Sequence, residues 1–530
     1  MESAPLVQAE ATPAVATRSW STATKAVAAA ALVAVVGTIV YVSLPAKMAV
    51  EPTPASFTYA PANFSLAGDL RLRCNETYIT QTLDHFTAHH ATYQQRYYVC
   101  GEFWNATADG PIFFFTGHEQ DVDIMVNTTG LMWENAAEFG ALLVFAEHRY
   151  FGKSFPQIAN ATFLDSLRFL SSEQALADYA VLVDHVKETF HAEESPVIAF
   201  GGSYAGLLAA WFRMKYPQVV DGAIASSAPI LAFDWEEPVF DALAYGRTTA
   251  FTGSPSAGAA EHCVPNIRRA KGLMMDLGFS PDIGAHAALR ESLKLCSMPT
   301  VPNDVNTIMD YFMSAYVTLA EGNYPYPSTY FGHFPAYPYR VACDHLAEAE
   351  YPDVLALLGN FSLSAGVALN DTGNVPCYEW NATVPVEKRN LWEYLECSEL
   401  YAPIYKHDGL QDFFRYTPID QAADAARCKA TWGVELRPTW AKDVYGGLAG
   451  VRASSNIVFS NGNYDPFSGY GVVMSFDDSI VPIAIEGAAH HLDLMFSNDA
   501  DPETVRAARA TEMSHVRKWI DEAKKAAEQE

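Results

Sequence analysis

The stretch from Val197 to Phe212, VIAFGGSYAGLLAAWF, constrains the fold of this 530-residue chain more than any other. It starts with a short apolar run, and the apolar residues after Ser203 recur at helical spacing. The stretch therefore predicts a strand, a sharp turn and a helix. Three residues around the serine have no side chain and leave room for a strained backbone: Gly201, Gly202 and Gly206.

A serine at such a turn projects its hydroxyl from the carboxyl edge of a sheet, with the positive end of a helix behind it. This arrangement is the nucleophile elbow of an α/β-hydrolase. The chain departs from the usual G-x-S-x-G pattern because Ala205, another small residue, stands in place of the last glycine. A glycine-rich turn capped by serine fits the same residues, so the motif alone leaves the function open.

Short apolar runs alternate with helical patterns along much of the chain, as in a parallel sheet covered by helices. The predicted strands are residues 111–116, 141–146, 197–200, 222–225, 456–460 and 481–485. The alternation stops between residues 233 and 428, which hold six of the eight cysteines and many aromatic residues. We expect an α/β-hydrolase fold built from residues 68–232 and 429–530, with residues 233–428 inserted as a mainly helical, disulfide-linked cap.

The N-terminal part of the chain carries a targeting signal. Residues 26–44 form a nearly uninterrupted apolar segment of 19 residues, preceded by Arg18 and Lys25. This length can span a bilayer, and the basic residues favour a cytosolic N-terminus. We expect a single-pass type II membrane protein with a cytosolic tail (1–25), a signal anchor (26–44) and a Pro/Ala-rich stalk (45–67). A cleaved signal peptide and a secreted protein are the alternative.

Cysteines and glycosylation sequons indicate an oxidising lumen or the cell exterior. The eight cysteines contain no C-x-x-C pair that would suggest zinc, and no metal site is expected. Eight asparagines stand in N-x-S/T sequons: Asn63, Asn75, Asn105, Asn127, Asn160, Asn360, Asn370 and Asn381. A formal net charge of -28 argues against binding to nucleic acid, whose phosphates would be repelled.

Partners for the serine follow two later predicted strands, in the order nucleophile, acid, histidine that this fold uses. Asp465 lies in a turn just after residues 456–460, and His490 and His491 follow residues 481–485. In this hypothesis Ser203 attacks a carbonyl, a histidine takes its proton, and Asp465 fixes the tautomer of the imidazole. Either histidine could instead be a structural residue.

An oxyanion hole needs two backbone donors aimed at the developing charge. The amide of Tyr204, directly after the nucleophile, is the first candidate. The loop after residues 111–116 offers Gly117 and His118, and we assign the second donor to Gly117. An ordinary turn glycine is an equally good interpretation of Gly117.

Seven sequence blocks carry a resemblance to a known family. They are QTLDHF (81–86), EHRYFGKSFP (147–156), SSEQALADYA (171–180), GGSYAGLLAAWFRMKYP, SSAP (226–229), SNGNYDPFSG (460–469) and EGAAHHLDL. In this order the chain resembles the prolyl carboxypeptidase family of serine peptidases, whose other branch is dipeptidyl peptidase II. The resemblance implies a lysosomal or secreted exopeptidase that needs no cofactor and cleaves peptides next to a proline near one terminus.

The resemblance also assigns residues. The nucleophile falls on Ser203, the acid on Asp465 and the base on His490, the first histidine of the pair. The family's cap disulfides imply three pairs, and two cysteines are left to pair with each other: Cys263 with Cys343, Cys296 with Cys377, Cys397 with Cys428, and Cys74 with Cys100. A homodimer is a possible assembly.

Departures from the family concern the substrate pocket. Phe467 stands where the family usually has a tryptophan beside the acid, which changes the shape expected for a proline-accepting pocket. Tyr204 and Phe467 flank residues of the predicted triad, and their rings could stack on a substrate proline or simply pack in the core. Met495 replaces a frequent arginine after HHLDL. We expect Glu147 and Arg149 to form a buried ion pair at the sheet edge.

Three functions remain open from the sequence. A serine exopeptidase, acting either as a Pro-X carboxypeptidase or as a dipeptidyl peptidase, agrees with every block above. A lipase or esterase would use the same triad. A catalytically silent adhesion protein would tend to lose the nucleophile or the base, whereas this chain keeps candidates for both.

Overall fold

The computed structural model describes residues 68–88, 90–237, 239–404, 413–415 and 417–529. The predicted cytosolic tail, signal anchor and stalk lie outside these residues, and so does Asn63. Within the described ranges, no helix combines the length and the apolar character needed to cross a bilayer.

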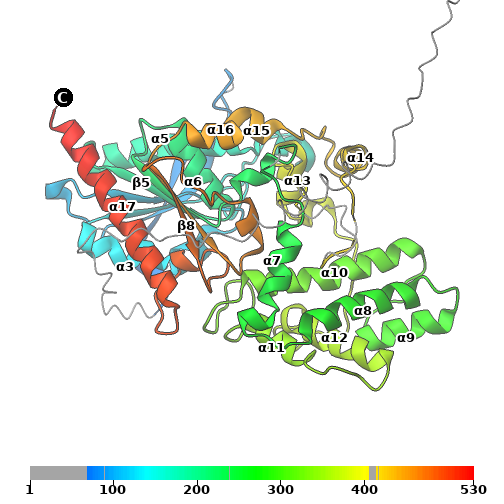
Figure 1. The fold of residues 1–530 in the computed structure, drawn as a ribbon. Coiled ribbons are helices and arrows are strands. Elements are labelled where there is room, and N and C mark those ends of the chain that lie inside the picture. The colour runs from blue at the N-terminus through cyan, green and yellow to red at the C-terminus, as the bar shows by residue number, and fades with distance from the viewer. Residues whose placement is uncertain (1–67, 89, 238, 405–412, 416, 530) are drawn as a thin grey trace, which may run out of the picture. The chain divides into compact units, whose positions relative to one another are not determined.

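An eight-stranded sheet forms the centre of the fold (Figure 1). Its strands are β1 (Asn75–Thr82), β2 (Thr92–Cys100), β3 (Ile112–Phe115), β4 (Leu142–Ala146), β5 (Val197–Gly202), β6 (Gly222–Ser226), β7 (Ile457–Gly462) and β8 (Ile480–Ile485). The strand order is β1-β2-β4-β3-β5-β6-β7-β8, and all neighbours from β4 to β8 run parallel. β1 and β2 add an antiparallel edge. This is the α/β-hydrolase fold that the sequence predicts.

The parallel strands β3 to β7 are buried on both faces, so their residues alternate between two separate apolar layers, while the edge strand β8 is partly exposed. Phe114 points into one layer, whereas Phe113 and Phe115 belong to the other. The first layer is covered by α5 (Ser172–Phe190) and α6 (Tyr204–Lys215). The second is covered by α2 (Val122–Thr128), α3 (Gly130–Phe139) and α17 (Glu503–Ala527), the long helix next to β8 in Figure 1. The short α4 (Phe163–Ser166) precedes α5.

A helical cap interrupts the chain after β6 and has a hydrophobic core of its own. Its helices, which form a group beside the sheet domain in Figure 1, are α8 (Cys263–Gly278), α9 (Ile283–Leu293), α10 (Pro302–Glu321), α11 (Pro338–Asp344) and α12 (Val354–Leu369). α7 (Ala244–Thr252) leads into this group. Disulfides join Cys263 to Cys343 and Cys296 to Cys377 within it. The cap is therefore a covalently reinforced insertion.

The last part of the segment that we expected to form the cap packs elsewhere. α13 (Trp392–Ser398) and α14 (Gln421–Trp432), joined by the Cys397–Cys428 disulfide, bury Leu395 and Trp432 in the apolar layer that α5 and α6 cover. α15 (Trp440–Tyr445) and α16 (Gly447–Arg452) continue along the same layer. α13 and α14 therefore pack on the sheet domain, whereas Phe413, which lies between them in the sequence, belongs to the core of the cap. The fourth disulfide, Cys74–Cys100, links the start of β1 to the end of β2.

Candidate active site

Ser203 occupies the turn between β5 and α6 in a backbone conformation that non-glycine residues rarely adopt, with φ 58° and ψ -125°. Such strain persists where the surroundings fix it, and it is typical of a nucleophile elbow. A Cβ atom on Gly201 would lie 2.1 Å from the carbonyl oxygen of Ala205, and one on Gly202 would lie 2.9 Å from Cγ of His491. The two glycines therefore allow the close approach of the helix start on one side and of the histidine loop on the other.

His490 and Asp465 meet at the carboxyl ends of β7 and β8. Nδ1 of His490 lies 2.9 Å from Oδ2 of Asp465, and the two side chains are 3% and 0% exposed. Asp465 is held in place because its Oδ1 accepts a hydrogen bond from the backbone N–H of Phe467. Burial lowers the pKa of His490, but the charge and the contact of Asp465 outweigh this effect, so the pKa lies above its ordinary value.

Hydrogen bonds from the cap and from the sheet domain hold the loop that carries the two histidines. The backbone N–H of His490 donates to the carbonyl of Glu321 at 3.2 Å, and its carbonyl accepts from the hydroxyl of Tyr324 at 2.9 Å. The backbone N–H of His491 donates to Oγ of Ser227 at 2.8 Å. Arg509 donates to the backbone carbonyls of Leu492, Asp493 and Met495. The histidine loop therefore has a defined position relative to the elbow.

His491 differs from His490 in its surroundings. It is 4% exposed, its ring centroid lies 4.6 Å from that of His490, and its φ is 37°. Burial and the neighbouring His490 and His118 hold its pKa well below the ordinary value, so the ring is neutral near pH 7. Because the contact with Asp465 is made by His490, the structure brings the first histidine of the pair, and not the second, to the acid.

The two candidate oxyanion donors belong to residues at the ends of secondary-structure elements. Tyr204 starts α6, and Gly117 follows β3. A Cβ on Gly117 would lie 2.4 Å from the backbone nitrogen of His148, so glycine is required at this close approach. The carbonyl of Gly117 accepts from the hydroxyl of Tyr179 at 3.2 Å, which orients the peptide group between Gly117 and His118.

Phe467 and Tyr204, the two aromatic residues expected to line a substrate pocket, differ in their burial and in their contacts. The Phe467 ring is half-buried and its centroid lies 5.2 Å from that of His490. The Tyr204 side chain is 2% exposed, and its hydroxyl lies 3.0 Å from Nε2 of His148. Its ring also meets Trp392 edge-on at 5.2 Å. This burial gives no support to the Tyr204 ring as part of a substrate pocket, whereas Phe467 adjoins the histidine directly.

Two carboxyl groups near His490 were not found from the sequence. Glu119 and Glu321 both favour the charged form of the imidazole. Oε2 of Glu119 lies 3.0 Å from Nδ1 of His118, on the loop after β3. Glu321 ends α10 in the cap. The motif GHEQD gave a local signal for Glu119, but nothing near Glu321 in the sequence points to a histidine in another domain.

The predicted ion pair between Glu147 and Arg149 is wrong. Arg149 binds Asp178, with Nε 2.7 Å from Oδ2, and Glu147 pairs with Arg96 on β2. Glu147 and Arg149 thus have separate partners, although only one residue lies between them. Each charge is still neutralised within the core, so these residues stabilise the sheet edge instead of lining the elbow.

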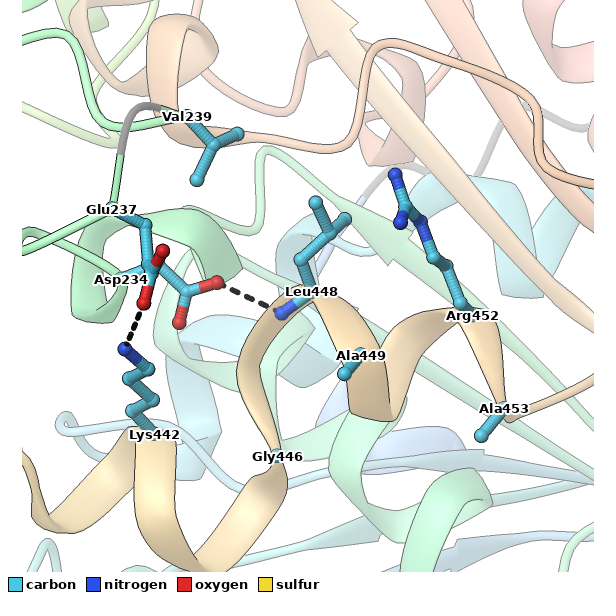
Figure 2. A pocket seen from close by; sticks show the side chains of 9 residues that line it. All are labelled: Asp234, Glu237, Val239, Lys442, Gly446, Leu448, Ala449, Arg452 and Ala453. Carbon is cyan, nitrogen blue, oxygen red and sulfur yellow. Dashed lines mark hydrogen bonds and ion pairs between the residues drawn. The ribbon is translucent and has the colours of Figure 1, made fainter.

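A cavity of about 680 Å³ is lined by residues around Asp234 and by α15 and α16, and none of Ser203, Asp465 and His490 is among its lining residues (Figure 2). Asp234 and Glu237 face Lys442 and the start of α16 across it. Oδ2 of Asp234 accepts from the backbone N–H of Leu448 at 2.8 Å, and Glu237 pairs with Lys442 at 2.7 Å. Asp234 thus caps the start of α16, and Glu237 and Lys442 neutralise each other, so all three side chains have a structural role. In the described part of the chain, no cluster of three or more histidine, cysteine or acidic side chains is placed to hold a metal ion.

The fold and the elbow define the chain as an α/β-hydrolase with a capped site. A family model described as "Serine carboxypeptidase S28" matches residues 81–512. The chain is 40% identical over 449 residues to the lysosomal Pro-X carboxypeptidase of Pongo abelii and 39% identical over 449 residues to that of Homo sapiens, in both cases covering 84% of this chain and 88% of the relative. Among solved structures, an esterase from Pyrobaculum calidifontis aligns with a TM-score of 0.30 and 10% identity, covering 84% of this chain and 86% of that one.

The chain therefore belongs to the serine carboxypeptidase S28 family. It is a serine-type peptidase, and peptides are its substrates.

Proposed function

We propose that the protein is a Pro-X carboxypeptidase, which removes the residue that follows a proline at the carboxyl end of a peptide. The observation that carries this proposal is the contact of His490 with Asp465 beside the Ser203 elbow, in a chain similar to lysosomal Pro-X carboxypeptidases. The esterase alternative shares the triad, but the family match favours peptides.

The mechanism assigns one step to each group. Ser203 Oγ attacks the carbonyl carbon of the scissile bond while His490 takes its proton, and a tetrahedral intermediate forms. His490 passes the proton to the leaving amine, the C–N bond breaks, and the substrate carbonyl remains on Ser203 as an ester. Water, deprotonated by His490, attacks this acyl-enzyme and releases the new carboxyl terminus together with the free serine. Asp465 holds Nδ1 protonated, which leaves Nε2 as the base.

Two backbone amides stabilise the oxyanion in this proposal. The amide of Tyr204 lies at the start of α6, where the helix dipole favours negative charge. The amide of Gly117, the residue whose carbonyl accepts a hydrogen bond from Tyr179, is the second donor. Phe467 forms one wall of the pocket for the proline ring because its ring adjoins His490.

The catalytic domain works in a lumen of the secretory pathway, the lysosome in particular. Four disulfides in the described chain and the similarity to proteins named lysosomal support this location. The sequence-based signal anchor at residues 26–44 would deliver the domain there.

Two measurements test the proposal with the purified full chain. Fluorophosphonate labelling followed by peptide mapping should modify Ser203, and a label on another residue would contradict the triad. Peptides with one proline should be cleaved when the amino terminus is blocked and resist cleavage when the carboxyl terminus is amidated. The opposite pattern would indicate a dipeptidyl peptidase.

A further inference from the structure

A second cavity, of about 460 Å³, lies between α7, α10 and the residues around Phe414. This volume is in the range of ligand pockets in proteins. One part of its lining is apolar or aromatic: Tyr245, Met313, Val317 and Phe414. The other part is polar: Asp310, Ser314, Thr318, Glu321, Arg415 and Thr417. A cavity of this composition can hold a side chain or a short segment of a peptide.

Two of the lining residues connect this cavity to the proposed reaction centre. The carbonyl of Glu321 accepts a hydrogen bond from the backbone N–H of His490 at 3.2 Å. The ring centroid of Tyr245 lies 5.4 Å from that of Phe467, which lies 5.2 Å from that of His490. The cavity therefore adjoins His490 on the cap side.

The charges of the lining leave one group available to a ligand. Arg415 is bound by both oxygens of Asp310, at 2.7 Å and 2.8 Å, so its positive charge is already neutralised. Glu321 is half-buried, and no hydrogen bond or ion pair joins its carboxylate to another residue in the described part of the chain. It also ends α10, where the helix dipole favours positive charge. The charge in the cavity lining that is not paired within the described part of the chain is therefore the negative charge of Glu321.

We propose that this cavity binds a positively charged group of the peptide substrate, with Glu321 as the residue that selects it. The group is an ammonium or guanidinium, supplied either by the free amino terminus of a short peptide or by a lysine or arginine side chain. This inference rests on the proposed function and adds a preference to it. A carboxyl terminus would be repelled by Glu321, so the cavity takes the part of the substrate that lies before the scissile bond.

The preference depends on pH because Glu321 must be ionised. Burial raises the pKa of Glu321 to about 7, with His490 lowering it and Asp465 and Glu119 raising it further. The paired Asp310 and Arg415 also face the cavity. Below pH 7 the carboxyl group is mostly neutral, and above it the negative charge is present. Discrimination in favour of cationic peptides should therefore increase with pH.

Equilibrium binding tests the proposal without any need for turnover. We would measure the affinity of a proline peptide that contains lysine for the full chain carrying Ser203→Ala, together with a norleucine analogue and an amino-acetylated analogue. At pH 8 one of the two analogues should bind about tenfold more weakly, because a charge-assisted hydrogen bond is lost. At pH 5.5 the difference should shrink to about twofold or less. The sensitive analogue identifies the side chain or the terminus as the source of the charge.

A second set of variants assigns the effect to the cavity. Adding Glu321→Gln should reduce the discrimination at pH 8 to about twofold or less, whereas Glu291→Gln, on the exposed surface of α9 in the same cap, should leave it at tenfold. Equal affinities for all three peptides in the parent, or discrimination that survives Glu321→Gln or disappears in Glu291→Gln, would overturn the inference. Hydrolysis that persists in Ser203→Ala would instead contradict the proposed function, and a binding preference at Glu321 could still be measured with uncleavable peptides.

Discussion

His490 and Asp465 form a contact of 2.9 Å between Nδ1 and Oδ2, and water reaches almost none of either side chain. In such a site a carboxylate fixes the proton on Nδ1 and stabilises the imidazolium that forms when Nε2 takes a proton. The same contact raises the pKa of His490 against the effect of burial. Two properties therefore depend on this pair, the basicity of the histidine and its tautomer.

Ser203→Ala should abolish nearly all peptidase activity without unfolding the protein. The variant removes one oxygen at a position that is half-buried, so the free energy of unfolding should change little. We expect kcat to fall by about 10⁴ to 10⁶-fold, as is typical for the loss of a triad nucleophile. Steady-state kinetics on a proline peptide measure the effect, and circular dichroism controls for folding. A well-folded variant with a loss below about tenfold would contradict the role of Ser203.

Asp465→Asn should change both the rate and the pH profile. We expect kcat/KM to fall by about 10³ to 10⁴-fold because the amide favours the wrong tautomer of His490. His490 acts as a base only when neutral, so activity rises with pH through its pKa. Asp465 raises that pKa. The variant should therefore shift the rising limb to lower pH, and an unchanged limb in a profile of kcat/KM from pH 4 to 9 would assign it to another group.

Strands could be predicted from the sequence where the local pattern of apolar residues matches their burial in the fold. The six predicted strands all form. β3 to β7 are fully buried and contain continuous apolar runs, and β8 is a mostly apolar edge strand. β1 and β2 were missed because the antiparallel edge alternates exposed polar residues with buried ones. The packing of α13 and α14 on the sheet domain could not be predicted, because they are helical like the cap and only tertiary contacts assign them to the sheet domain.

For the candidate site, the sequence predicted the positions of Ser203, Asp465 and His490 from the order of strands and loops. Preference for His490 over His491 came from the resemblance, and the contact with Asp465 is a property of the folded chain. Contacts made by cap residues Glu321 and Tyr324 with the backbone of His490 could not be predicted. They depend on how a cap helix packs against a loop that follows much later in the sequence.

Gly202→Ala should lower activity more than a generic glycine substitution. The added Cβ, on the residue next to Ser203 in the chain, would lie 2.9 Å from Cγ of His491, so the histidine loop or the elbow must move. We expect a loss of kcat of at least about 10²-fold, since small displacements of catalytic groups have large effects, and destabilisation of about 1–3 kcal/mol.

Gly359→Ala is the matched control for this prediction. Gly359 lies in α12, and a Cβ there meets no atom within 4 Å. Alanine should stabilise that helix by up to about 1 kcal/mol and leave kcat unchanged. Equal kinetics of the two variants would show that the space at Gly202 is not needed for the reaction.

Removal of the Cys263–Cys343 disulfide should destabilise the cap. The bond closes a sequence separation of 80 residues between α8 and α11, so its loss increases the conformational freedom of the unfolded chain. We expect the double variant Cys263→Ala/Cys343→Ala to lose about 2–4 kcal/mol in denaturant unfolding. Proteolysis should then cut first within residues 263–343, and an unchanged denaturation midpoint would show that the core of the cap suffices.

Glu512→Gln should stabilise the protein at neutral pH and have less effect in acid. Glu512 is fully buried beside Asp493, whose oxygens accept hydrogen bonds from Ser226 at 2.8 Å and Ser460 at 2.7 Å. Burial, and then the charge of Asp493, raise the pKa of Glu512 well above its ordinary value. A carboxyl group with a raised pKa in the folded state stabilises that state below the unfolded pKa, and the stabilisation is lost as pH rises toward the folded pKa.

The pH dependence separates this effect from ordinary packing. Glutamine does not titrate, so the stability of the variant relative to the parent should increase between pH 5 and 7, by about 1–2 kcal/mol. Urea unfolding at several pH values measures the difference. Glu522→Gln, on the exposed side of the same helix α17, is the control and should show no such trend because solvent reaches this side chain. If the difference in the free energy of unfolding between Glu512→Gln and the parent is constant with pH, Glu512 is not held neutral in the folded protein.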